Sequence, residues 1–246
     1  MGGQRCHPHP CQRGIGIRAM QPAVTVPVRH SLVRLTAGGW LEAVSSALPG
    51  HREPLLYWME RDLPLIVRRR SEFDPPGCLC LGLSLPPSRG KLRVPIAVPH
   101  AAASNIREPL LFEDIVISAP ADWQQTLRDL IERLAAKGIR PQIYGAFAWQ
   151  HMTGNNYVHA QSDVDLLVRF TSPLMFENFT HVVSGWESKH GKLADGELLF
   201  PNRDAVAWRE INGTSRHVLV KSDIGARLVS RDELKRRMSF ESGFSA

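Results

Sequence analysis

The run Ser162-Asp163-Val164-Asp165-Leu166-Leu167-Val168 constrains the fold more than any other part of the chain. Its alternation predicts a β-strand that turns Val164 and every second residue after it toward a core. Asp163 and Asp165 then share the opposite face, about 7 Å apart along the strand. Two carboxylates held this way repel each other and are costly to desolvate, which a divalent cation such as Mg²⁺ would offset. Alone, the pair could equally begin a solvated edge strand, so the neighbouring sequence decides.

A glycine before a helix supplies that context. Gln142-Ile143-Tyr144 predicts a short strand that ends at Gly145, and Ala146–Met152 predicts a helix. Glycine lets the backbone approach a phosphate closely, and the N-terminus of a helix favours phosphate binding. Gly145 and Ala146 are therefore candidate substrate-binding residues through their backbone amides.

The order of these elements resembles the nucleotidyltransferase superfamily, which has the polymerase-beta-like fold. Tyr144-Gly145-Ala146 stands for the family's Gly-Ser element, and Asp163 and Asp165 stand for its pair of carboxylates on a strand. Ala146 lacks the serine hydroxyl of the family pattern, and the spacer over residues 147–162 is somewhat long. The resemblance implies that Asp163 and Asp165 are catalytic and bind one or two Mg²⁺ ions.

The resemblance also implies a third carboxylate on a neighbouring strand. Asp195, Glu197 and Glu210 are the candidates. We favour Glu197 as the third catalytic carboxylate, because it enters the apolar strand formed by residues 198–200.

We expect an α+β protein with two domains, divided near residues 112–120. Residues 30–115 should form a small, strand-rich domain that binds substrate or a partner, and residues 116–246 a nucleotidyltransferase-like catalytic domain with a mixed sheet and flanking helices. The first domain is expected to contain a helix over Leu41–Leu48, stopped by Pro49-Gly50, and strands over Leu63–Arg70, Leu79–Leu85 and Leu92–Val98. The second is expected to contain a helix through Trp123 and Leu134, a helix capped by Ser172, a final helix capped by Ser230, and strands over Asp163–Phe170, Glu197–Phe200, Ala205–Glu210 and His217–Lys221.

The formal net charge of +6 is concentrated in two stretches. The first 30 residues carry four arginines and no acid, and residues 61–93 carry seven basic and three acidic residues, which leaves −2 for the rest of the chain. A nucleic-acid track would spread basic residues over one face with aromatic residues between them. The observed distribution instead favours a polyphosphate substrate or an acidic partner protein.

Six basic residues are candidate binders of that substrate. They are Arg68, Arg69, Arg70, Lys91, Arg93 and Lys221. On extended strands Arg68 and Arg70 share a face, as do Lys91 and Arg93, so each pair could bind a phosphate group. Docking of an acidic protein and a solvated strand edge are the alternatives.

Residues 1–29 differ from the rest of the chain, being rich in Gly, Pro, Arg and His, and we expect a disordered leader there. It contains no apolar segment typical of a secretory signal. Cys6, His7, His9 and Cys11 are donors that suit zinc, but their spacing is not that of a zinc finger. Four cysteines without an export signal favour the cytoplasm, and no apolar run is long enough to span a membrane.

Several short strings together resemble one family within that superfamily, the malonate decarboxylase holo-acyl-carrier-protein synthases, also called phosphoribosyl-dephospho-CoA transferases. They are Pro64-Leu65-Ile66-Val67-Arg68-Arg69, Gly82-Leu83-Ser84-Leu85-Pro86-Pro87, Gly90-Lys91-x-Arg93, Ala148-Trp149-Gln150, Thr153-Gly154, Ser162-Asp163-x-Asp165, Ala207-Trp208-Arg209-Glu210 and Val218-Leu219-Val220-Lys221. Their order and spacing carry the resemblance, which covers about residues 30–230.

This resemblance implies a definite reaction. A serine of the apo acyl-carrier-protein subunit of malonate decarboxylase attacks 2′-(5″-triphosphoribosyl)-3′-dephospho-CoA, diphosphate leaves, and the prosthetic group stays attached to the serine. The basic residues would then bind the triphosphate or the dephospho-CoA diphosphate. Two alternatives stay open, another Mg²⁺-dependent nucleotidyltransferase such as an adenylyltransferase, and a non-catalytic nucleic-acid-binding protein.

Overall fold

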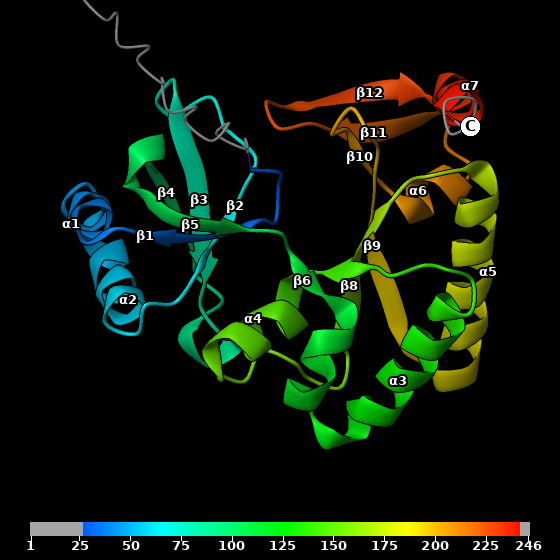
Figure 1. Ribbon diagram of the computed structural model, residues 1–246, viewed down its shortest axis with the longest axis horizontal. Helices are drawn as coiled ribbons and strands as arrows, with labels where there is room; N and C mark the ends of the chain where they lie inside the picture. Colours follow the sequence, from blue (N-terminus) through cyan, green and yellow to red (C-terminus); the bar gives the residue numbers. More distant parts are fainter. Residues whose placement is uncertain (1–26, 242–246) are drawn as a thin grey trace, which may run out of the picture.

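The computed structural model describes residues 27–241, and these form two β-sheets with helices packed against each (Figure 1). The first sheet has the strand order β4-β3-β2-β1-β5, with all neighbouring strands antiparallel. Its strands are β1 (Leu32–Leu35), β2 (Leu65–Val67), β3 (Cys78–Ser84), β4 (Arg93–Pro99) and β5 (Ala103–Arg107). β2, β3 and β4 lie where the sequence predicts strands.

Two helices, α1 (Ala37–Ser45) and α2 (Pro49–Glu60), complete the core of this domain. Trp58 and Leu55 of α2 are buried with Leu81 of β3 in one apolar cluster. Helix α2 was not expected, and the prediction that Pro49 stops a helix is wrong. Pro49 instead begins α2, where its missing N–H costs nothing because the first turn of a helix has no acceptor for it.

The second sheet is mixed and has the strand order β12-β11-β10-β9-β8-β7-β6. Its strands are β6 (Leu110–Leu111), β7 (Gln142–Ile143), β8 (Asp163–Arg169), β9 (Leu193–Leu199), β10 (Ala205–Ala207), β11 (His217–Lys221) and β12 (Ala226–Ser230). β8 and β9 are parallel, and the other pairs are antiparallel. The change from one sheet to the other therefore comes before residue 110, whereas the sequence places the boundary at 112–120.

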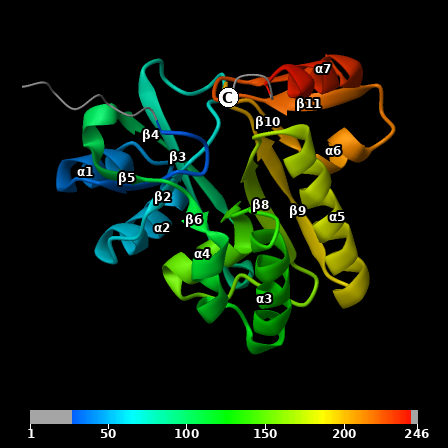
Figure 2. The same ribbon diagram turned by 45° about the vertical axis from the view of Figure 1, so that its right-hand side comes forward.

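Helices α3 (Ala121–Ala135) and α5 (Pro173–His190) pack together beside this sheet. Figure 2 shows α5 lying along β9. Trp186 of α5 is fully buried and donates its indole N–H to the carbonyl of Thr126 at 2.7 Å. The predicted N-cap is confirmed, because the hydroxyl of Ser172 accepts the N–H of Met175 at 3.1 Å.

The C-terminal part departs from the expected pattern after Ala207. The predicted strand Ala205–Glu210 is half wrong, since β10 ends at Ala207 and helix α6 (Trp208–Asn212) follows. Trp208 and Ile211, three residues apart, are both buried on one face of this helical turn, whereas on a strand they would point to opposite faces of the sheet. The final helix α7 (Arg231–Glu241) begins as predicted, with the hydroxyl of Ser230 accepting the N–H of Glu233 at 3.2 Å.

Helix α4 (Gly145–Thr153) joins the two domains. Phe147 is buried in the core of the second domain, with its ring edge-on to Trp123 at 5.1 Å between centroids. Trp149 is buried in the core of the first domain and lies 6.2 Å from the ring of Trp58. The two cores therefore share one helix. None of the helices within residues 27–241 has the length and apolar character needed to span a membrane.

Candidate functional site

A cleft of about 830 Å³ lies between the domains. One wall is the face of β2, β3 and β4 that the first domain's helices do not cover. The other wall is the start of α4 together with the start of β8. This volume is within the range of nucleotide-sized ligand sites.

The paired carboxylates of β8 face this cleft, as the alternation predicts. Asp163 and Asp165 line it, while Val164 and Leu166 are fully buried on the opposite face of the strand. Asp165 pairs in register with Asp195 of the parallel neighbour β9, so their side chains lie on the same face of the sheet. Burial, followed by repulsion from Asp163 and Asp195, raises the pKa of Asp165 to about 7. The face thus concentrates negative charge that favours a cation.

Gly145 sits directly beneath these carboxylates. Its φ is +69°, and a Cβ atom built there would collide with the carboxylate of Asp165. The N–H of Tyr144 donates to the backbone carbonyl of Asp165 at 3.0 Å, which holds the two segments together. Gly145 is therefore required both for its left-handed backbone and for the space that Asp165 occupies. Gly145 and Ala146 both line the cleft at the start of α4, where their amides can meet a phosphate.

The favoured third carboxylate, Glu197, lies on the same face of β9 two residues beyond Asp195, but it is held by cations. Glu197 is 5% exposed, accepts a hydrogen bond from Nζ of Lys221 at 2.8 Å, and forms a second ion pair with Arg29. Asp195 is half-buried, and its Oδ1 accepts no hydrogen bond from the described residues, with Nε of Arg209 3.8 Å away. Asp195 is thus the acid nearest in register to Asp165, and Glu197 is the one already neutralised.

The end of the expected leader is part of this site. Residues 27–29 are described, and Arg29 contacts Glu197. His30, with φ +71°, stacks on the ring of Tyr144 at 4.0 Å between centroids and lines the cleft. Burial, followed by the charges of Arg29 and Lys221, lowers the pKa of His30 well below its ordinary value. No local pattern marks these two residues, because their partners are more than a hundred positions away along the chain. The Cys6, His7, His9 and Cys11 hypothesis lies outside the described residues.

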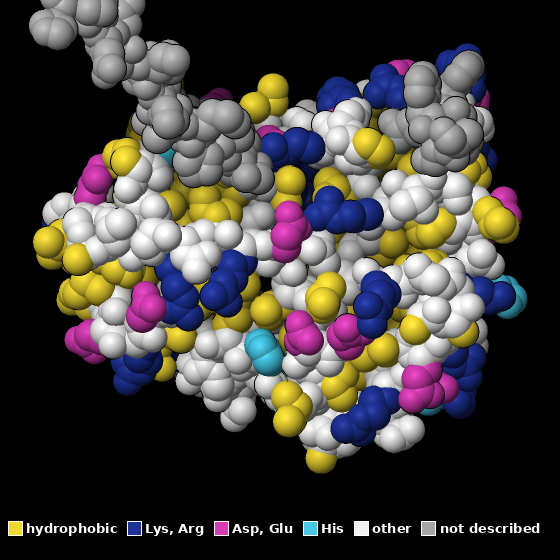
Figure 3. Space-filling view, in the orientation of Figure 1, with side chains coloured by type: hydrophobic (Ala, Val, Ile, Leu, Met, Phe, Trp, Pro, Cys, Tyr) yellow, Lys and Arg dark blue, Asp and Glu magenta, His cyan; other side chains and the backbone are white. Residues whose placement is uncertain are grey.

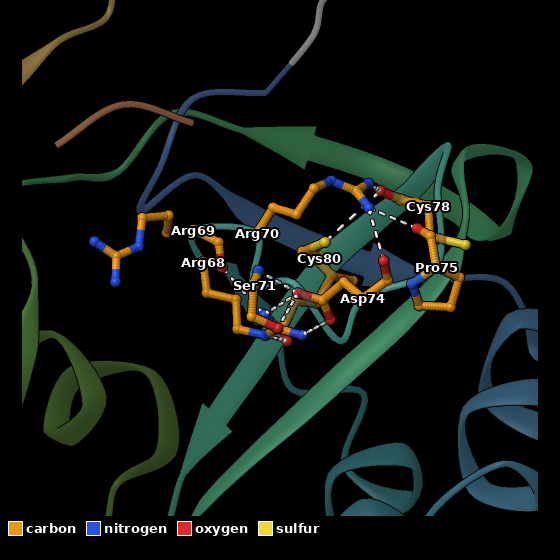
Figure 4. Close-up of polar contacts among 9 residues, drawn as sticks. Arg68, Arg69, Arg70, Ser71, Asp74, Pro75, Cys78 and Cys80 are labelled. Atoms are coloured by element: carbon orange, nitrogen blue, oxygen red, sulfur yellow. Dashed lines mark hydrogen bonds and ion pairs between the residues drawn. The ribbon is translucent and has the colours of Figure 1, made fainter. Parts of the chain in front are cut away.

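The basic triplet after β2 divides into two roles (Figure 4). Arg68 lines the cleft, but its guanidinium forms a two-armed ion pair with the buried carboxylate of Asp74, 2.7 Å on one arm. Arg70 donates to the carbonyls of Pro75 and Cys78, both at 2.6 Å. Arg68 and Arg70 therefore hold the loop 71–77, so both guanidiniums that were predicted to share a phosphate are already engaged within the protein.

Arg69 points away from this network in Figure 4 and does not line the cleft. Its charge acts on Arg29 and Lys221, lowering the pKa of each after the larger effect of burial. Lys221, also predicted to bind phosphate, is half-buried against Glu197 and likewise does not line the cleft.

Lys91 and Arg93 are the basic residues that remain available in the cleft. Both line it, both are exposed, and neither side chain forms a hydrogen bond or ion pair with any residue between 27 and 241. The charge of Arg93 acts on Asp165 and opposes the rise of its pKa. The two candidates therefore keep the geometry that phosphate binding needs.

The acidic residues at the cleft provide part of a Mg²⁺ coordination sphere. In the part of the chain that the structure describes, no three His, Cys, Asp or Glu side chains form a ready-made metal site. Asp163 and Asp165 nevertheless provide hard oxygen donors on one face, and Mg²⁺ characteristically takes one or two carboxylates together with substrate phosphates. The buried Oδ1 of Asp195 accepts no hydrogen bond from the described residues, which is consistent with a cation in the complete site.

Comparisons with known proteins agree over nearly all of the described chain. Residues 28–109 match the model for the phosphoribosyl-dephospho-CoA transferase MdcG N-terminal domain, and residues 91–232 match the model for the C-terminal domain. A phosphoribosyl-dephospho-CoA transferase of Xanthomonas euvesicatoria is 40% identical over 206 residues, covering 84% of this chain and 95% of the relative. One of Bradyrhizobium diazoefficiens is 34% identical over 219 residues, covering 88% and 93%. One of Pseudomonas putida is 28% identical over 169 residues, covering 68% and 78%. No solved structure matches the chain.

Proposed function

The chain belongs to the phosphoribosyl-dephospho-CoA transferase family, and from this membership we propose how it selects its acceptor and performs the transfer. It is a transferase of the phosphoribosyl-dephospho-CoA group. The proposed donor is 2′-(5″-triphosphoribosyl)-3′-dephospho-CoA, and the proposed acceptor is a serine of the apo acyl-carrier-protein subunit of malonate decarboxylase. The observation that carries the proposal is that Asp163 and Asp165 line the same cleft as Lys91 and Arg93, whose side chains have no ion-pair partner among residues 27–241.

The transfer exchanges one phosphorus–oxygen bond for another. The serine oxygen attacks the phosphorus next to the ribose, the bond from that phosphorus to the departing diphosphate breaks, and the serine hydroxyl proton is released. Such reactions depend on positioning and charge neutralisation more than on covalent help from the protein. The amides of Gly145 and Ala146, at the positive end of α4, are placed to hold the leaving diphosphate.

Asp163 and Asp165 are the residues that would hold Mg²⁺. When bound, Mg²⁺ would neutralise the triphosphate and lower the pKa of the incoming hydroxyl. The raised pKa of Asp165 supports this assignment, because burial and, after it, the charges of two further aspartates disfavour its charged form.

We assign the role of third carboxylate to Asp195 in place of Glu197. Asp195 lies beside Asp165 across the parallel pair β8 and β9, and its Oδ1 accepts no hydrogen bond from any residue that the structure describes. It is placed to accept the serine proton. Glu197 is bound by Lys221 and Arg29 and serves to anchor the segment that carries His30.

The test is the intact mass of the apo carrier subunit before and after incubation with the full chain, Mg²⁺ and triphosphoribosyl-dephospho-CoA. We expect the subunit to gain the mass of one phosphoribosyl-dephospho-CoA group. Asp163→Asn and Asp165→Asn should each slow the gain by about 1,000-fold or more, since each removes a charge that positions the reacting phosphate. Asp122→Asn is the matched control, because Asp122 is exposed in the first turn of α3 and does not line the cleft.

Two results would reject the proposal. Labelling of a nucleic acid or another acceptor by ATP, with no change in carrier mass, would favour an adenylyltransferase. Near-normal transfer by Asp163→Asn or Asp165→Asn would remove the assigned role of these residues. A nucleic-acid-binding protein is the less favoured alternative, since acidic and apolar side chains are interspersed with the basic ones on the face seen in Figure 3.

A further inference from the structure

The wall of the cleft formed by the first sheet contains a gap in its row of side chains. Ile66 of β2, Gly82 of β3 and Pro95 of β4 pair across the three strands and therefore lie on the same face. All three line the cleft. Gly82 has no side chain, so this row is a shallow trough with an apolar residue on each side.

Neither backbone geometry nor packing explains glycine at position 82. Its φ is not in the left-handed region, and a Cβ atom there would meet only the carbonyl of Val94 at 3.4 Å and Cδ of Arg68 at 3.6 Å, which are ordinary contacts. Glycine within a central strand lowers stability, and it often marks a place where a ligand approaches the backbone closely. The trough is therefore a site for a flat, apolar group.

The next row of the same face carries positive charge. Ser84 pairs with Arg93, two residues and about 7 Å along the strands from the row of Gly82. Lys91 lies beside this row, and neither cation is paired within the described residues. Tyr157 donates its hydroxyl to the carbonyl of Ser84 at 2.7 Å and so fixes the loop after α4 against this end of the wall.

We propose that this wall is the binding site for the dephospho-CoA half of the donor. The adenine ring lies on Gly82 between Ile66 and Pro95, and Arg93 and Lys91 bind the diphosphate that follows the adenosine. The inference rests on the proposed function and deepens it. It separates two anion sites within one cleft, since on the opposite wall the triphosphate would be held by the amides of Gly145 and Ala146 and by Mg²⁺ on Asp163 and Asp165. It also explains why Arg68, which is paired with Asp74, can contribute its aliphatic stem beside Gly82 rather than its charge.

The experiment measures binding of two probes to the full chain by titration calorimetry, dephospho-CoA alone and inorganic tripolyphosphate with Mg²⁺. Gly82→Val fills the trough, and we expect it to weaken dephospho-CoA binding about 10-fold or more, with a smaller loss for Gly82→Ala. Arg93→Gln should weaken dephospho-CoA binding about 10-fold by removing a charge-assisted hydrogen bond. Both variants should bind tripolyphosphate as the unaltered chain does.

Two controls separate this site from a general loss of structure. Arg89→Gln removes a cation from the same loop, but Arg89 pairs with Glu53 at 2.7 Å away from the cleft, so dephospho-CoA binding should not change. Gly82→Ala should not lower the melting temperature, because its Cβ atom would make only ordinary contacts and alanine loses less backbone entropy on folding than glycine does. If Gly82→Val does unfold the chain, Gly82→Ala and Arg93→Gln still decide the question.

The outcomes distinguish the inference from the proposed function. Suppose that the unaltered chain modifies the carrier subunit, while Arg93→Gln and a folded Gly82 variant (Gly82→Val or Gly82→Ala) bind dephospho-CoA normally. The proposed dephospho-CoA site is then wrong and the proposed function stands. Failure of the unaltered chain to bind dephospho-CoA would also reject the proposed dephospho-CoA site. If the variants lose dephospho-CoA binding as expected but the unaltered chain modifies no carrier subunit, the proposed dephospho-CoA site is supported and the proposed acceptor is wrong.

Discussion

Replacing Gly145 by alanine should remove transfer activity through a single added methyl group. The left-handed backbone at Gly145, φ +69°, costs an alanine about 1 kcal/mol. The larger effect is steric, because the new Cβ atom and the carboxylate of Asp165 cannot occupy the same space. Asp165 must turn away, and a displacement of about 1 Å at a reacting centre can cost about 100-fold in rate. We therefore expect kcat/KM for carrier modification to fall by about 100-fold or more.

The same helix provides the control. Gly154, at the other end of α4, also has φ +69°, but a Cβ atom there would meet no atom within 4 Å. Gly154→Ala should therefore lose about 1 kcal/mol of unfolding free energy and keep its activity. The assay compares urea unfolding with the rate of mass gain of the carrier subunit. Equal activities for Gly145→Ala and Gly154→Ala would refute the argument, since only the steric contact with Asp165 distinguishes them.

Three further predictions concern stability. The pKa of Asp165, raised to about 7, lies above its unfolded value of about 4. The Mg²⁺-free protein should therefore lose unfolding free energy as the pH rises between these values, and added Mg²⁺ should restore it above pH 7. A flat profile of unfolding free energy against pH without Mg²⁺ would contradict the burial of this charge. Asp74→Asn leaves Arg68 without its carboxylate partner and should cost about 2 kcal/mol in urea unfolding, more than the few tenths expected if the pair were fully solvated. Gly196→Ala, at φ +140°, places a Cβ atom against the backbone of β8 and should lower stability by about 3 kcal/mol, whereas Gly185→Ala in α5 meets nothing within 4 Å and should be neutral or slightly stabilising in thermal melts.

The local sequence pattern was sufficient to predict a feature where the residues that form it are close in sequence. The face shared by Asp163 and Asp165 follows from the period of two in a strand, and the N-caps Ser172 and Ser230 follow from hydrogen bonds that span three residues. Gly145 before a helix could be recognised for the same reason. The mistaken stop at Pro49 shows the limit even of local rules, since proline is compatible with either side of a helix boundary.

The roles of charged residues could not be predicted in this way. Arg68 and Arg93 look equivalent in the sequence, yet the loop 71–77 returns Asp74 to Arg68, whereas the side chain of Arg93 has no ion-pair partner in the described part of the chain. Asp195 and Glu197 are two residues apart on one strand, and the register of β9 with β8 decides which of them meets Asp165.

By itself, the sequence determined the α+β class, the carboxylate strand, the glycine before α4 and the resemblance to a transferase family, because each depends on short-range periodicity or on motifs in order. Only the tertiary structure decided which cations are free, which acid completes the carboxylate face, and that Arg29 and His30 belong to the site. These depend on contacts between residues tens to hundreds of positions apart. Such contacts are formed when α4 packs into both cores and brings the wall of Gly82 opposite the wall of Asp165.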